Sequence, residues 1–268
     1  MSIAQTGKTP EAANSPCAFS VSSASLRPVA VSVGMGNILE IEDLHVRYHD
    51  GTVALDGASL TVAQGERVAL IGPNGAGKTS FLLAILGGVP SAGKIVVDGI
   101  ELRRPALGDV RGRCGMTFQN PDDQLFMPTL LDDVAFGPLN QGLSPAAAQE
   151  TAKAAIEAVG LAGLENRSPH HLSGGQKRSA SLATIVAMNV KLLLLDEPAA
   201  NLDFRSRRRL LDILTRRPEA MLLATHDLRM VEELCSRVVL LDAGHVVADR
   251  PTGEILADAA LLSEHGLG

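Results

Sequence analysis

Short, continuous runs of apolar residues punctuate the chain after residue 37, and helix-compatible stretches separate them. Apolar runs without alternation are expected of strands that are buried on both faces of a parallel sheet. The regular succession of strands and helices predicts the α/β class. The predicted strands are 68–71, 95–97, 114–118, 192–195, 221–224 and 238–241.

One helix is marked at both ends by its sequence. Ser144 is a good N-cap residue, Pro145 suits the first helical position, and Gly160 can end the helix. The sequence therefore predicts a helix over residues 144–159. The chain contains no internal repeat, so we treat residues 38–268 as one compact unit.

The first 37 residues differ from the rest of the chain. Ser, Ala, Val and Pro dominate residues 15–33, with little charge and no sustained period. Serines interrupt every apolar stretch that a secretory signal would need, and a transit peptide would be richer in arginine. We expect a disordered tail over residues 1–37. An alternative is that translation begins at Met35, since the organised pattern starts directly after it.

The bulk properties exclude several classes of protein. The net charge of −6 and the lack of a long basic block argue against a nucleic-acid partner. The three cysteines lie far apart, which fits neither a disulfide framework nor a zinc site and favours a reducing cytosol. No apolar run approaches the roughly 20 residues that span a bilayer, so a role at a membrane would need a partner.

A P-loop pattern, G-x-x-x-x-G-K-[ST], follows the predicted strand 68–71 and opens a predicted helix over 78–86. Glycines let backbone N–H groups turn toward phosphate oxygens, and the helix N-terminus adds partial positive charge. Lys78 is expected to reach the β- and γ-phosphates, and the Thr79 hydroxyl is expected to ligate Mg²⁺. The predicted nucleotide-binding residues in this stretch are Gly72, Pro73, Asn74, Gly75, Ala76, Gly77, Lys78, Thr79 and Ser80.

An acidic pair, Asp196 and Glu197, ends the apolar run 192–195. Buried carboxylates are costly without compensation, and a structural ion pair is one interpretation. Beside a P-loop, we expect Asp196 to hold Mg²⁺ through water. Glu197 is then expected to polarise the attacking water as the general base.

A second glycine-rich turn, Ser173-Gly174-Gly175-Gln176, opens another predicted helix. It resembles the signature motif of the ABC ATPase family. The resemblance implies that this motif binds the γ-phosphate held by a second ABC ATPase subunit, identical or different, in a sandwich dimer with two ATP sites. It also implies a P-loop NTPase fold with a mostly parallel core sheet, an N-terminal antiparallel β subdomain and an inserted helical subdomain over about 125–178.

Further residues follow in the order of the same family. The resemblance implies that Gln119 touches Mg²⁺ and senses the membrane subunit, that Asp203 belongs to the D-loop, and that His226 contacts the γ-phosphate. The expected catalytic residues are therefore Glu197, His226 and Gln119. Tyr48 falls where the family places an aromatic ring that stacks on adenine, and packing in the core is its alternative role.

Residues 120–126 and 133–138 resemble a narrower group, the ATPases of energy-coupling-factor importers, including cobalt and nickel systems. This resemblance implies a peripheral subunit at the cytoplasmic face of the cell membrane that hydrolyses ATP to power import of a metal ion or a vitamin. Its partners would be a transmembrane scaffold and a small substrate-binding membrane protein. Asp122 and Asp123 are expected to meet basic residues of that scaffold. The alternatives are an exporter motor and a soluble ABC ATPase of cluster assembly.

Overall fold

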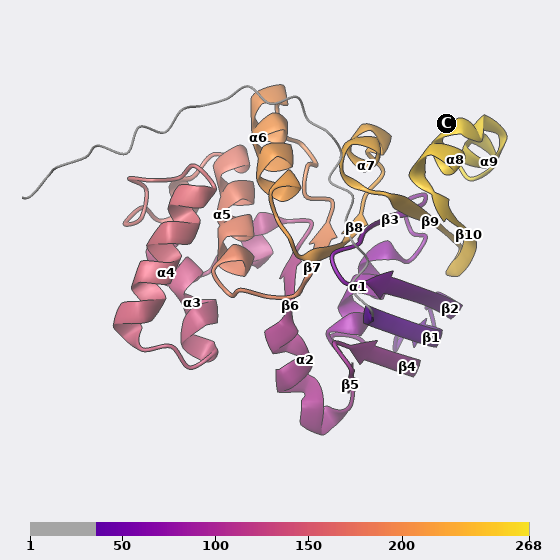
Figure 1. The fold of residues 1–268 in the computed structure, drawn as a ribbon, viewed down its shortest axis with the longest axis horizontal. Helices are drawn as coiled ribbons and strands as arrows, with labels where there is room; N and C mark the ends of the chain where they lie inside the picture. The colour runs from indigo at the N-terminus through magenta and orange to yellow at the C-terminus, as the bar shows by residue number, and fades with distance from the viewer. Residues whose placement is uncertain (1–35, 268) are drawn as a thin grey trace, which may run out of the picture. The chain divides into compact units, whose positions relative to one another are not determined.

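Two β-sheets organise residues 36–267, the part of the chain that the computed structural model describes (Figure 1). The smaller sheet contains β1 (Asn37–Arg47), β2 (Val53–Ala63), β4 (Ser91–Val97) and β5 (Ile100–Glu101). The larger sheet contains β3 (Arg67–Ile71), β6 (Cys114–Thr117), β7 (Leu192–Asp196), β8 (Ala220–Ala224), β9 (Arg237–Asp242) and β10 (His245–Pro251).

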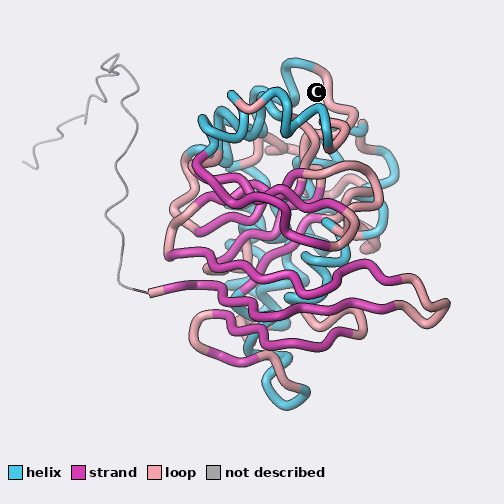
Figure 2. Tube along the Cα trace, turned by 90° about the vertical axis from the view of Figure 1, so that its right-hand side faces the viewer, coloured by secondary structure: helices cyan, strands magenta, loops and turns pink. Residues whose placement is uncertain are grey.

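The larger sheet is parallel except at one edge. Its strand order is β10-β9-β3-β8-β7-β6, and only the pair of β10 with β9 is antiparallel. The smaller sheet is antiparallel throughout, in the order β2-β1-β4-β5. Figure 2 shows the long strands of the smaller sheet running side by side below those of the larger one. The predicted α/β class, with a mostly parallel core and an N-terminal antiparallel sheet, is confirmed.

The helices divide between the two faces of the larger sheet. One hydrophobic core joins that sheet to α1 and to the smaller sheet, and the other joins it to the helices α3 to α9. The helices are α1 (Lys78–Ile85), α2 (Leu107–Arg113), α3 (Leu130–Asn140), α4 (Pro145–Ala158), α5 (Gly174–Val186), α6 (Phe204–Thr215), α7 (Leu228–Leu234), α8 (Thr252–Ala257) and α9 (Ala259–Glu264), with short 3₁₀ turns at Arg104–Ala106, Pro121–Asp123 and Pro169–His171.

Strand β7 shows why the continuous apolar runs predicted central strands. Its five residues are all buried. Leu192 and Leu194 contribute to the core on the α1 side, whereas Leu193 and Leu195 contribute to the core under the other helices. Because side chains alternate between the two faces of a strand, a strand covered on both faces needs an apolar residue at every position.

The predicted boundaries agree closely with the described elements. The Ser144 hydroxyl accepts a hydrogen bond from the Ala147 N–H, and α4 ends just before Gly160, whose φ is +75°. Strand β1 begins at Asn37, the last residue of the predicted tail, and residues 1–35 of that tail, with Met35, lie outside the described residues. The helix that begins at the signature motif continues to Val186, beyond the predicted end of the helical subdomain at 178. No helix within residues 36–267 has the length and apolar character that a bilayer crossing requires.

Candidate nucleotide-binding and hydrolysis site

The P-loop joins the end of β3 to the start of α1, and two of its glycines are required by their surroundings. Gly72 has a φ of +155°, and a Cβ there would lie 2.0 Å from the Leu241 carbonyl oxygen. Gly77 has a φ of +106°, and a Cβ there would lie 2.4 Å from the Ala54 carbonyl oxygen. Since no side chain fits at either position, the loop packs closely against β2 and β9 and presents its backbone to a ligand.

Lys78 turns its ammonium group back into the P-loop. Its Nζ donates hydrogen bonds to the carbonyl oxygens of Gly72 at 2.7 Å and Pro73 at 2.9 Å. Burial lowers the pKa of Lys78, and the nearby carboxylates of Glu197 and Asp196 oppose that shift. An ammonium group has three donors, so one donor is left for a phosphate oxygen.

Thr79 and Asp196 meet although they come from different elements. The Thr79 hydroxyl donates to the Asp196 carboxylate at 2.7 Å. Burial raises the pKa of Asp196, and the hydrogen bond from Thr79 opposes that shift. A hydroxyl oxygen beside a carboxylate oxygen is the hard donor set that suits Mg²⁺, so these two residues fit the predicted metal.

Glu197 lies at the end of β7 and is held by the chain that follows β8. Its Oε2 accepts from the Thr225 hydroxyl at 3.0 Å. Its Oε1 accepts from the backbone N–H of His226 at 3.1 Å and lies 2.8 Å from His226 Nδ1. Glu197 also has a φ of +45°, an uncommon conformation for a residue that is not glycine. The structure therefore fixes a buried carboxylate against His226, the residue that is predicted to contact the γ-phosphate.

Tyr48 and Gln119 flank this arrangement. The Tyr48 hydroxyl lies 2.9 Å from the Ser80 Oγ, and its ring packs partly against the core beside α1. Its predicted stacking on adenine stays a prediction, because the structure also supports the packing role. The Gln119 side chain is exposed and makes no hydrogen bond within the described part of the chain. Only its backbone is anchored, through its carbonyl oxygen.

The signature residues form a helix start of their own. The Ser173 Oγ accepts from the Gln176 N–H at 3.3 Å, and the Gln176 side chain accepts from the Ser173 N–H at 2.9 Å, which is a capping box. Asp203 similarly caps α6 by accepting from the N–H groups of Arg205 and Ser206. Within residues 36–267, no hydrogen bond joins residues 173–176 to the P-loop.

Two residues that the sequence did not single out hold the site together. The Thr225 hydroxyl donates a hydrogen bond to Glu197. Arg178, which lies on α5, donates to the carbonyl oxygens of Phe118 and Gln119. The sequence carries a weak signal for each, because Thr225 directly precedes His226 and Arg178 lies two residues after the signature motif. Neither signal reveals the contact, which joins segments far apart in the chain.

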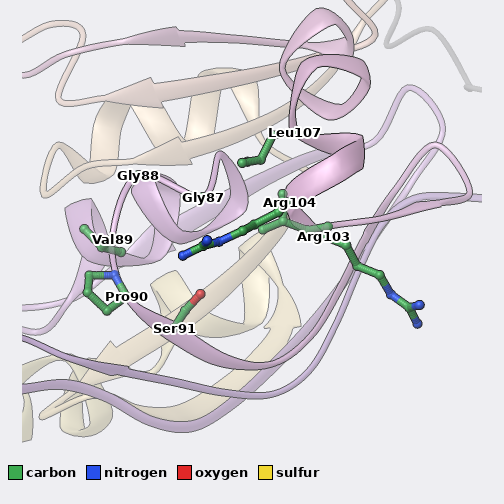
Figure 3. Close-up of a pocket in the computed structure, with 9 residues that line it drawn as sticks. Gly87, Gly88, Val89, Pro90, Ser91, Arg103, Arg104 and Leu107 are labelled. Atoms are coloured by element: carbon green, nitrogen blue, oxygen red, sulfur yellow. The ribbon is translucent and has the colours of Figure 1, made fainter.

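A separate surface hollow lies after the C-terminal end of α1, the end opposite the P-loop. Its lining includes Gly87, Val89, Ser91 and Arg104. Figure 3 shows the Arg104 side chain lying across this hollow, whereas the Arg103 side chain points away from it. The hollow is therefore not part of the nucleotide site.

Comparison with known proteins agrees with this geometry. The sequence model of the family described as ABC transporter matches residues 55–200. A protein of Gloeobacter violaceus described as an ABC transporter ATP-binding protein is 49% identical, over 85% of this chain and 95% of its own. The energy-coupling factor transporter ATP-binding protein EcfA of Methanothermobacter thermautotrophicus is 41% identical, over 86% of this chain and 76% of its own. Among solved structures, cbiO1 of Clostridium perfringens, part of the ABC transporter complex cbiONQ, aligns with a TM-score of 0.74 at 30% identity, over 86% of this chain and 95% of its own.

Proposed function

We propose an import function for this chain, which belongs to the ABC transporter family and is an ATP-binding, ATP-hydrolysing subunit. ATP hydrolysis drives uptake of a small solute, either a metal ion such as cobalt or nickel or a vitamin, through a separate transmembrane scaffold. The relatives named for the energy-coupling factor transporter and for cbiONQ support this class of importer. The chain then works at the cytoplasmic face of the cell membrane as a peripheral subunit.

The proposed hydrolysis reaction uses the groups that converge at the end of β7. The P-loop and Lys78 bind the phosphates, and Glu197 orients and polarises the attacking water. His226, fixed by Glu197 at 2.8 Å, contacts the γ-phosphate. Mg²⁺ would be held by Thr79, Asp196 and Gln119, and when bound it neutralises charge that develops on the transferred phosphoryl group.

An exposed apolar patch is the observation that carries the transport proposal. Phe126 is 62% exposed and Phe136 is 41% exposed, and their rings meet edge to face with centroids 5.2 Å apart. Leu139 and Leu143 are exposed on the same part of the chain. We name these four residues the apolar patch. Contiguous exposed apolar surface marks interaction sites, and Phe126 in this patch lies a few residues after Gln119, the predicted sensor of the membrane subunit.

Asp133 holds the start of the apolar patch in place. Its Oδ1 accepts from the N–H groups of Phe126 and Met127, both at 3.0 Å. Burial raises the pKa of Asp133, and the two backbone hydrogen bonds oppose that shift. A buried carboxylate that organises an exposed phenylalanine favours a preformed docking surface over a disordered loop.

The test is affinity purification of the tagged chain from its own membranes in mild detergent, followed by mass spectrometry. We expect the wild type to recover a scaffold with several membrane spans and a small membrane protein. The Phe126→Ser/Phe136→Ser variant should bind ATP normally yet lose both partners. Val247→Ser, which removes from β10 an apolar side chain about as exposed as that of Phe136, is the matched control. Recovery of soluble proteins alone by the wild type would refute the transport proposal and leave the ATPase chemistry intact.

A further inference from the structure

The segment 118–124, here called the Gln119 segment, lies against the signature helix α5. Arg178, in the second turn of α5, donates through Nη1 to the carbonyl oxygens of Phe118 at 3.1 Å and Gln119 at 2.7 Å. Its Nη2 donates to the carbonyl oxygen of Ala200 at 3.4 Å. One guanidinium thus joins α5, the Gln119 segment and the chain that leads from Glu197 to the D-loop.

Two more side chains join the same elements. Gln124 accepts from the Phe118 N–H at 3.2 Å and donates to the Ser181 carbonyl oxygen at 2.9 Å and the Thr184 hydroxyl at 2.7 Å. The Lys177 ammonium lies 2.6 Å from the Asp122 carboxylate. The Lys177 side chain is 18% exposed and that of Asp122 is 51% exposed, so the ion pair is covered on the α5 side and open to water on the other. The Gln119 segment is therefore fastened to α5 at both of its ends and in its middle.

Burial of the charged Arg178 side chain at this position is unfavourable. It is 6% exposed, and burial lowers its pKa, while Asp196 and Glu197 attract its charge without forming a salt bridge. A neutral side chain of similar size often packs at lower cost than a buried charge. Since the guanidinium donates its hydrogen bonds to three backbone carbonyl oxygens, its role is to fix backbone positions.

We propose that Arg178, with the Lys177–Asp122 ion pair, is a positioning device that holds Gln119 at a fixed place relative to the signature motif and to Glu197. This inference rests on the roles proposed above for Gln119 and for Ser173–Gln176. A displacement of the start of α5 on nucleotide contact then moves the Gln119 segment with it. The device also gives Asp122 an intramolecular partner, where the sequence predicts a basic residue of the scaffold.

A charge swap tests the ion pair in the purified chain. Asp122→Lys and Lys177→Glu should each lower kcat for ATP about three- to tenfold, with KM nearly unchanged, because small displacements of a positioned group reduce the rate. The double variant should recover kcat to within about twofold of the wild type, since it restores a pair of opposite charges. Backbone amides of the Gln119 segment should exchange hydrogen faster in the single variants only. The matched control is the same swap at the exposed Glu150–Lys153 pair on α4, which should change neither quantity.

The outcomes separate the positioning role from partner docking. Normal kcat in both single variants, with loss of the membrane partners in Asp122→Lys, would overturn the proposal and favour docking by Asp122. A double variant that performs no better than the single ones would also overturn it. Arg178→Met should lower kcat at least tenfold by the same reasoning, and Arg178→Lys should recover part of the loss. If Arg178→Met fails to fold, the charge swap still decides.

Gln119→Ala distinguishes the failure of this proposal from the failure of the function on which it rests. If Gln119→Ala lowers kcat and the positioning variants do not, the positioning role is wrong and the role of Gln119 stands. If Gln119→Ala leaves kcat unchanged, the role proposed for Gln119 is wrong, and the positioning role is wrong with it.

Discussion

At the scale of single residues, the proposed hydrolysis reaction depends on how firmly Glu197 is held. Its two carboxylate oxygens receive hydrogen bonds from Thr225 and from the backbone of His226, and the His226 ring lies against one of them. These contacts leave the carboxylate little freedom to rotate. A general base that is fixed in this way can meet a water molecule without reorganisation.

The Glu197→Gln variant removes the charge and keeps the shape. We expect ATP binding to persist, because Lys78 and the P-loop are untouched, and kcat to fall between about 100- and 10,000-fold. Steady-state hydrolysis and equilibrium binding of a fluorescent ATP analogue measure the two effects. Glu233→Gln, an exposed carboxylate on α7 that pairs with arginines of α6, serves as the control. Turnover at the wild-type rate in Glu197→Gln would exclude this residue from the mechanism.

At the scale of elements, one carboxylate joins the turn after β4 to two other parts of the chain. Asp98 lies 2.7 Å from the Lys191 ammonium, just before β7, and 2.9 Å from the Arg113 guanidinium at the end of α2. The hydrogen bond from Lys191, with that from Arg113, lowers the pKa of Asp98. A lowered pKa in the folded state stabilises the protein above the unfolded pKa of about 4, and this stabilisation disappears as pH falls through the folded value.

Asp98→Asn should therefore destabilise the chain in a way that depends on pH. Asparagine tolerates the φ of +50° at this position, so the change acts mainly on charge. We expect a loss of about 1 kcal/mol in the free energy of unfolding at pH 7, and the difference from the wild type should shrink below about pH 4. Urea unfolding at several pH values measures both. Asp109→Asn on α2 reports the general effect of removing a carboxylate nearby, and a difference at Asp98 that stays constant with pH would contradict the ion-pair explanation.

The sequence predicts elements better than it predicts contacts between them. The buried strands and the cap at Ser144 are readable because periodicity and local hydrogen bonding act over a few residues. The P-loop and the acidic pair are readable because their spacing follows from phosphate chemistry. The pairing of Asp122 with Lys177 cannot be predicted from the sequence, because it depends on how α5 packs against a segment more than fifty residues away in the chain. The same limit hid Arg178 and Thr225.

At the scale of the whole molecule, the predicted signature residues of one chain are not joined to the residues that converge at its P-loop. Lys78, Thr79, Asp196, Glu197 and His226 converge, whereas Ser173 to Gln176 begin α5 without a hydrogen bond to that group within residues 36–267. We propose that a second ABC ATPase subunit, a copy of this chain in the simplest case, supplies the missing half of each site. Two variants can each disable one half. Lys78→Ala removes the ammonium group that is predicted to bind phosphate, and Gly174→Glu places a negative side chain at the signature motif.

Gly174→Glu is suited to this purpose because of its surroundings. A Cβ at Gly174 has no neighbour within 4 Å and φ there lies outside the left-handed region, whereas a Cβ at Gly175 would lie 2.8 Å from the Ser206 Oγ. The added carboxylate should therefore repel a phosphate without disturbing α5. Each variant alone should be inactive, since every site in its homodimer has a disabled half. In a mixed dimer, one site combines both defects and the other site has neither.

An equal mixture of the two variants should therefore recover hydrolysis, up to about a quarter of the wild-type rate, because about half of the dimers are mixed and each has one intact site out of two. Measuring ATPase activity against the mixing ratio gives a maximum at equal amounts. Mixing each variant with Glu197→Gln adds a check. Gly174→Glu with Glu197→Gln should again leave one intact site and recover activity. Lys78→Ala with Glu197→Gln should stay inactive, because the P-loop side of both sites is then disabled. The mixture of Lys78→Ala and Gly174→Glu could also stay inactive although both variants fold and exchange subunits. That result would show that a copy of this chain does not complete the site, and that a different ABC ATPase subunit completes it.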